Sequence, residues 1–169
     1  MRATWGARGG ERGAEFAGSG LAAAVALEAR DNNGPSLRVQ VLSYPVVDAT
    51  LSHASVTENS AAPFFGKAQI TWFLDHYMAA DTDSRDPRLP PLYANDPSGL
   101  PPALISTAEF DPTRDEGEAY ADKLTAANVD VEYLPYAGVF HGFGLMSKVI
   151  PEGAQLLEAQ AAFIKLHMA

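Results

Sequence analysis

The sequence predicts an α/β protein in which a short parallel sheet of about three strands is flanked by helices. Three mostly apolar runs, at 37–45, 102–110 and 129–136, have the length and composition of strands. Helical patterns lie between or beside them, and strands that alternate with helices are typical of a parallel sheet with right-handed crossovers. We therefore expect ligands to bind beyond the carboxyl ends of these strands.

The first helix and the first strand are predicted from composition and from their stops. Residues 21–30 are good helix formers except for Val25, and the Asn-Asn-Gly-Pro stretch at 32–35 ends the helix. The run at 37–45 is rich in β-branched and apolar residues and ends at Pro45. It is therefore predicted to be a buried strand.

Residues 46–100 are interpreted as a lid-like insert. The segment 46–66 is predicted to be irregular, whereas 69–78 carries one apolar stripe at helical spacing, formed by Ile70, Phe73, Leu74 and Tyr77. Half of the twelve prolines then fall between residues 87 and 102. They predict a long loop that no helix can enter.

The remaining elements follow in β-α-β order. The strand at 102–110 leads through Asp111-Pro112 into a helix at 115–128, whose first turn is acidic, as the helix dipole favours. A strand at 129–136 and a closing helix at 151–167 complete the prediction.

Two titratable residues occupy the positions where a ligand is expected. Asp111 follows the second strand and His141 follows the third. An Asp and then a His on such loops match the chain order of the last two members of a Ser-Asp-His triad, in which the carboxylate orients the imidazole and the imidazole takes the serine proton. The alternatives are that Asp111 is a helix N-cap, worth about 1 kcal/mol, and that His141 is an ordinary loop residue.

Three sequence strings support the triad interpretation: SYPVVD at 43–48, GLPPALISTAEFDPTRDEGEAYADKL at 99–124 and FHGF at 140–143. With them, the chain from about Ala17 onward resembles the carboxyl-terminal half of the hormone-sensitive-lipase-like esterases, the bacterial family IV. The resemblance implies a partial α/β-hydrolase fold and a serine carboxylesterase activity on short acyl esters. It also implies that Asp111 is the triad acid and His141 the triad base.

The amino-terminal part departs from this family. Its nucleophile elbow, Gly-Asp-Ser-Ala-Gly-Gly-Asn-Leu, places Phe16 at the serine when it is aligned without gaps on Leu21. No His-Gly-Gly-Gly occurs, so half of the oxyanion hole is missing. Ser19, about one helical turn further on, is a candidate substitute nucleophile, although a helix-capping role is favoured for it. We expect weak or no activity in this chain.

Residues 1–16 are expected to be a non-family tail, and 17–169 a truncated α/β-hydrolase domain. The tail holds three of the twelve basic residues and four glycines, with no apolar period. It is interpreted either as vector-derived sequence or as a flexible native tail, and both remain open.

Composition excludes several classes of function. The net charge of −9, with no basic stripe, excludes nucleic acid as a partner. The absence of cysteine excludes disulfides, a thiolate nucleophile and Cys-ligated metals, and is consistent with a cytoplasmic protein. The longest apolar run, 21–27, is shorter than the roughly 20 residues of a membrane span. We expect no cofactor and no metal, because the acidic cluster at 81–86 lacks the glycine and glutamate of an EF-hand.

A small ester substrate is the expected partner, and the alternative function is an inactive hydrolase remnant that serves as an assembly module. Without the amino-terminal half of the fold, the strand at 37–45 becomes a sheet edge open to another chain. A homo-oligomer is expected through this edge, or through the last strand and helix at 131–136 and 155–167. The aromatic cluster of the insert either lines an acyl pocket or, as the favoured alternative, belongs to the core; it comprises Phe64, Phe65, Trp72 and Phe73.

Overall fold

The computed structural model describes residues 14–15, 17–79, 81–86 and 90–168. The strands are β1 (Ala14–Glu15), β2 (Gln40–Ser43), β3 (Ala103–Phe110) and β4 (Val131–Phe140). The helices are α1 (Ala17–Asp31), α2 (Ala54–Glu58), α3 (Lys67–Tyr77), α4 (Arg114–Ala126) and α5 (Pro151–Met168), with short 3₁₀ turns η1 (Pro91–Tyr93) and η2 (Phe143–Met146).

All strand pairs of the sheet are parallel, in the order β1-β2-β3-β4. Ser43 pairs with Ser106, and Ser106 pairs in turn with Leu134, so the carboxyl ends of the three longer strands point in one direction. The predicted α/β class and the predicted three strands are confirmed, and β1 adds a fourth strand of two residues.

β1 corrects the expectation that the first predicted strand is an open sheet edge. Ala14 pairs with Leu42 and Glu15 with Ser43, so the carboxyl half of β2 is covered. The physical reason is local: β1 is followed almost directly by α1, which returns the chain to β2 as a parallel β-α-β unit. These two residues lie within the segment that was expected to be a non-family tail.

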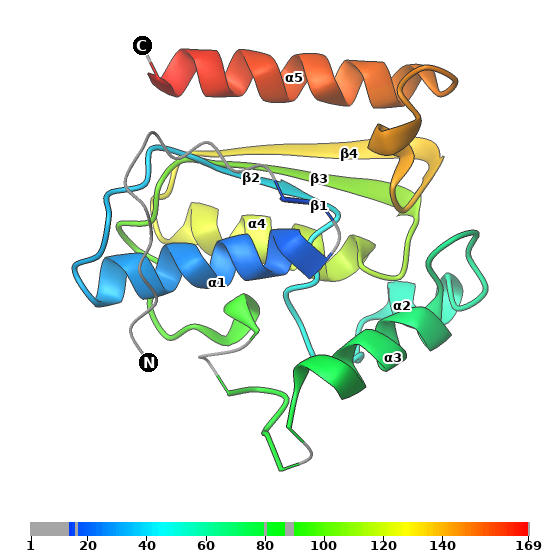
Figure 1. The fold of residues 1–169 in the computed structure, drawn as a ribbon, viewed down its shortest axis with the longest axis horizontal. Helices are drawn as coiled ribbons and strands as arrows, with labels where there is room; N and C mark the ends of the chain where they lie inside the picture. The colour runs from blue at the N-terminus through cyan, green and yellow to red at the C-terminus, as the bar shows by residue number, and fades with distance from the viewer. Residues whose placement is uncertain (1–13, 16, 80, 87–89, 169) are drawn as a thin grey trace.

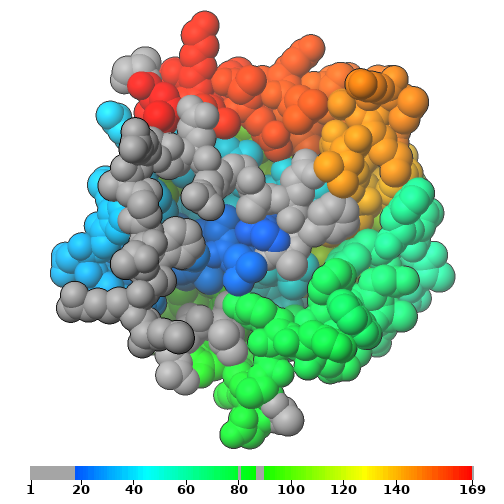
Figure 2. Space-filling view, in the orientation of Figure 1, coloured from blue at the N-terminus to red at the C-terminus, as the bar shows by residue number. Residues whose placement is uncertain are grey.

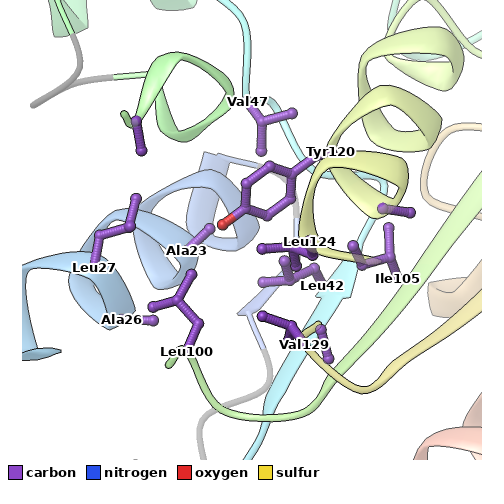
Figure 3. Close-up of a cluster of buried hydrophobic side chains, with 13 residues drawn as sticks. Ala23, Ala26, Leu27, Leu42, Val47, Leu100, Ile105, Tyr120, Leu124 and Val129 are labelled. Carbon is purple, nitrogen blue, oxygen red and sulfur yellow. The ribbon is translucent and has the colours of Figure 1, made fainter. Parts of the chain in front are cut away.

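The strands alternate their side chains between two helical layers. Leu42 and Ile105 face the cluster formed with α1 and α4, whereas Val41 and Leu104 pack with Phe163 of α5. Figure 1 shows α5 across one face of the sheet, α1 and α4 across the other, and α2 and α3 at one end. In the larger cluster the ring of Tyr120 lies between α4 and α1, with its hydroxyl pointing toward α1 (Figure 3).

The insert differs most from the prediction. The segment expected to be irregular contains α2, and the proline-rich loop contains η1. On α3 the predicted stripe is only partly a core face, because Ile70 is buried but Phe73 and Tyr77 are 42% and 48% exposed. Phe64 and Trp72 are exposed as well, so the core alternative for the aromatic cluster is correct only for Phe65.

Hydropathy and length set the described helices apart from membrane spans. None of them, over the described ranges, is both long and apolar enough to cross a bilayer.

Candidate active site

The structure brings Asp111 and His141 together at the carboxyl ends of β3 and β4. Nδ1 of His141 lies 2.7 Å from Oδ2 of Asp111, and the two residues are 1% and 0% exposed. Because an ionised carboxylate only accepts hydrogen bonds, this contact is an Nδ1–H donated to Asp111. It fixes the tautomer in which Nε2 can accept a proton.

The second oxygen of Asp111 organises its own loop. Oδ1 accepts hydrogen bonds from the backbone N–H of Thr113, at 2.8 Å, and from its hydroxyl, at 2.9 Å. Thr113 directly precedes α4. The N-cap interpretation of Asp111 is wrong, because the N-cap residue of α4 is Thr113. One oxygen of Asp111 instead orders the turn before α4, and the other contacts the imidazole.

Two aromatic rings lie against the His141 imidazole. Phe65 of the insert is stacked on it, with ring centroids 4.2 Å apart and an interplanar angle of 25°. Tyr44, directly after β2, lies 5.1 Å away at 52°, and its hydroxyl accepts a hydrogen bond from the backbone N–H of Gly144. Gly142 has a left-handed φ of 83°, which a glycine adopts without strain and which turns the chain sharply after His141.

Ser19 occupies a different environment. It is buried in the first turn of α1, where its hydroxyl donates to the carbonyl of Ser43 at 2.9 Å and accepts from the Ser43 N–H at 3.1 Å. Within the described residues the hydroxyl is not bonded to the imidazole of His141. These two bonds do not cap α1, because Ser19 lies inside the helix and the N–H that it binds here belongs to β2.

β1 ends at Glu15 and α1 begins at Ala17. Phe16, which the sequence comparison aligned with the serine, lies outside the described residues.

A cavity of about 280 Å³ lies between the start of α1 and the insert. Most of its lining is apolar, and the ionisable side chains on it are those of Asp48, His76 and Tyr77. Figure 2 shows α1 at the centre of this face with the helices of the insert beside it. Phe65 contributes to the cavity wall and also stacks on His141, which is not itself one of the residues that line the cavity.

Several residues of the site were not identified from sequence reasoning. Tyr44 and Glu116 fall inside the strings SYPVVD and DEGEAY that signalled the family, but a string does not reveal contacts. Burial raises the pKa of the Glu116 carboxyl well above its usual value, and repulsion from Asp48 and Asp111 adds to this rise. Over the described ranges, no three His, Cys, Asp or Glu side chains form a group that could hold a metal ion.

Comparisons with known proteins agree with the fold. A family described as alpha/beta hydrolase fold matches residues 15–145. The carboxylesterase NlhH of Mycobacterium tuberculosis is 41% identical over 154 residues, which cover 89% of this chain and 48% of that protein. The carboxylic ester hydrolase LipN of the same organism is 42% identical over 136 residues, covering 78% of this chain and 36% of that protein.

A solved structure matches over the same extent. The ester hydrolase EH1AB1 from the metagenome of Lake Arreo superposes with a TM-score of 0.86 and 38% sequence identity, covering 91% of this chain and 49% of that chain. The chain thus spans about half the length, or less, of the relatives it matches.

Proposed function

The chain belongs to the hormone-sensitive-lipase-like esterases of the alpha/beta hydrolase fold, and on this premise we propose that it carries the acid and base of an ester-hydrolysing site. The observation that supports this most directly is the 2.7 Å contact between His141 Nδ1 and Asp111 Oδ2 in a buried setting. Sequence, fold and contact geometry point to the same two residues.

In the proposed reaction, His141 is the general base and Asp111 is its orienting carboxylate. Nε2 takes the proton of a serine hydroxyl as the serine oxygen attacks the ester carbonyl, and the resulting imidazolium is stabilised by the negative charge of Asp111. The imidazolium then returns the proton to the leaving alcohol, which leaves an acyl-enzyme. Attack by water on this intermediate releases the acid.

The proposed substrates are small carboxylic esters with a short acyl chain. The printed names of the relatives describe carboxylic ester hydrolysis. A cavity of about 280 Å³ with apolar walls suits a small uncharged group, and Phe65 on its wall also stacks on the imidazole of His141. Esters with long acyl chains are expected to fit it less well.

Feeble hydrolysis is proposed for the chain as it stands. The residue aligned with the family serine is Phe16, and the sequence contains no His-Gly-Gly-Gly. Removing one oxyanion-hole donor typically costs about 10²–10³ in turnover, and loss of the nucleophile usually costs more. Ser19 does not compensate in this proposal, because its hydroxyl is held by the backbone of Ser43.

Restoring a serine tests the proposal. We would prepare the unchanged chain, Phe16→Ser and Phe16→Ala, and measure hydrolysis of p-nitrophenyl butyrate together with covalent labelling by a fluorophosphonate. Phe16→Ser should gain labelling at residue 16, with fluoride as the leaving group, and should exceed Phe16→Ala in hydrolysis. General base catalysis contributes about 10²–10⁴, so His141→Ala added to Phe16→Ser should remove most of the gain.

The matched control is His76→Ala, which changes a histidine on the cavity but not the one bonded to Asp111. Equal labelling of Phe16→Ser with and without His141 would contradict the assignment of the base. If Phe16→Ser folds like the unchanged chain and behaves as Phe16→Ala, the alignment of residue 16 with the serine is wrong.

Self-association is the second proposed property, and it corresponds to the alternative of an assembly module. Over the described residues β4 pairs with β3 on one side only, and α5 beside it exposes Leu157 and Leu166. We propose a second copy of the chain as the occupant of this edge. Sedimentation velocity over a range of concentrations should show a dimer that Leu166→Lys weakens, whereas a monomer at every concentration would refute it.

A further inference from the structure

Two buried carboxyl groups, those of Asp48 and Asp111, act electrostatically on a third, that of Glu116. Asp48 follows β2, Asp111 follows β3, and Glu116 lies in the first turn of α4. Three neighbouring negative charges in a buried setting are strongly unfavourable, so one of these groups is expected to keep its proton. The hydrogen bonds indicate which one.

Asp48 and Asp111 each have contacts to donors on both oxygens. For Asp48, Oδ1 accepts from the N–H of Thr50, and Oδ2 accepts from the Thr50 hydroxyl and lies 3.3 Å from Nε2 of His53. For Asp111, Oδ1 accepts from Thr113 and Oδ2 from His141. Each carboxyl oxygen of these two residues therefore has a partner.

Glu116 has donors on one oxygen only. Its Oε1 accepts from the backbone N–H of Val47, at 2.8 Å, and of Asp48, at 3.4 Å. Its Oε2 is buried and has no hydrogen-bond partner among the described residues. An ionised Glu116 would therefore leave part of its negative charge without a donor.

We propose that Glu116 is a positioning residue that works in its neutral, protonated form and fixes the backbone of Val47 and Asp48 at the cavity wall. Both of these residues line the cavity. A neutral acid can hold the two N–H groups through Oε1 without adding a third negative charge beside Asp48 and Asp111. This inference does not depend on ester hydrolysis by the chain.

Electrostatics agree with the hydrogen-bond pattern. Burial is the main cause that raises the pKa of Glu116, and the charges of Asp48 and Asp111 raise it further, whereas the two backbone N–H groups lower it. The net direction is well above the usual value. The ionisable groups that act on Glu116 from the facing segments are these two carboxylates, one after β2 and one after β3.

Glu116→Gln tests the proposal, because glutamine keeps the accepting oxygen and cannot ionise. Unfolding by urea would be measured from pH 5 to pH 8 for the unchanged chain and for the variant. Glu118→Gln is the matched control, since it removes an exposed carboxylate from the same helix.

The sign of the expected effect follows from proton linkage. If the folded state keeps a proton that the unfolded state loses above a pH of about 4.3, the unchanged chain loses stability as pH rises toward the folded-state pKa. Its unfolding constant, divided by that of Glu116→Gln, should therefore rise by up to about tenfold per pH unit in this window. For Glu118→Gln the same ratio should stay nearly constant.

A ratio that stays constant or falls with pH for Glu116→Gln would overturn the proposal, because it would mean that Glu116 is ionised in the folded state. A second measurement covers the case in which the variant does not fold. In the unchanged chain, the ¹³C resonance of the Glu116 carboxyl should keep the shift of a protonated acid at pH 7, and the shift of a carboxylate would refute the assignment.

Amide hydrogen exchange tests whether Glu116 positions the backbone of Val47 and Asp48. Glu116→Ala removes the acceptor, so the amide hydrogens of Val47 and Asp48 should exchange at least tenfold faster than in the unchanged chain. Glu116→Gln should restore their protection. Equal protection in a folded Glu116→Ala would show that Glu116 does not position this segment.

Discussion

Nδ1 of His141 donates a hydrogen bond to Oδ2 of Asp111 across 2.7 Å, although the two residues are 30 positions apart in the chain. They meet because β3 and β4 are parallel neighbours and each residue follows the carboxyl end of its strand. The contact is also buried, so it is screened little by solvent.

Asp111→Asn should remove the negative charge at this position and keep a side chain of nearly the same shape. An asparagine can present an N–H to the imidazole and favour the tautomer that cannot act as a base through Nε2, a change that typically costs about 10⁴ in turnover. In the Phe16→Ser background, hydrolysis of p-nitrophenyl butyrate should fall to the level of Phe16→Ala. Asp122→Asn, which changes an exposed carboxylate of α4, should leave hydrolysis unchanged.

Ser19→Ala should affect stability rather than catalysis. The substitution removes both hydrogen bonds to the Ser43 backbone and leaves buried groups unsatisfied, which costs about 1–3 kcal/mol of unfolding free energy. Urea denaturation measures this loss, with Ser60→Ala on the surface as the control. If Ser19→Ala folds normally and abolishes the hydrolysis of the unchanged chain, Ser19 is the nucleophile and the structural assignment is wrong.

Tyr120→Phe should be neutral or stabilising by about 1 kcal/mol. The Tyr120 hydroxyl is buried in the core between α1 and α4 without a hydrogen-bond partner among the described residues, so its removal relieves a desolvation cost. Tyr133→Phe is the matched comparison, because the Tyr133 hydroxyl bonds Thr107 Oγ1 at 2.9 Å. Urea denaturation should show that Tyr133→Phe lowers the free energy of unfolding by about 1 kcal/mol. An equal loss of stability in Tyr120→Phe would contradict the expected difference between the two hydroxyl groups.

Gly20→Ala should strain the contact between α1 and the cavity wall. A Cβ at this position would clash with the backbone oxygen of Val46, so one of the two segments must shift. Overpacking of this kind typically costs about 1–3 kcal/mol. Thermal and urea unfolding would measure the loss, and the neighbouring Leu21→Ala, at a partly exposed position, should cost less. If Gly20→Ala is as stable as the unchanged chain, the expected strain between α1 and the segment around Val46 is wrong.

The order of strands and helices was predictable because each main element carries its own periodic or compositional signal. The residues at which these elements begin and end were less predictable. β4 continues past the predicted end at Tyr136 to Phe140, because Gly138 adopts a positive φ of 75° and the strand resumes its pairing with Phe110 after an irregularity. β1 was not predicted, since two residues carry no period and their pairing depends on β2.

The candidate site was predictable only where sequence strings identify residues. Asp111 and His141 were named from their strings and their places after strands, and the structure brings them into contact. The stacking of Phe65 on His141 was not predictable, because it joins the insert to a loop about 75 positions further on and is decided by packing. The same holds for Glu116, whose hydrogen-bond donors and charged neighbours come from two other segments.

The β3-α4-β4 unit supplies both Asp111 and His141 from one continuous stretch of chain, and this has a consequence for the order of assembly during folding. Closing a loop of 30 residues loses less chain entropy than joining segments that are farther apart in the sequence, such as Ser43 and Gln160, which meet across 117 positions. Contacts of shorter range tend to form earlier. The acid and base should therefore be in place before the closing helix docks on the sheet.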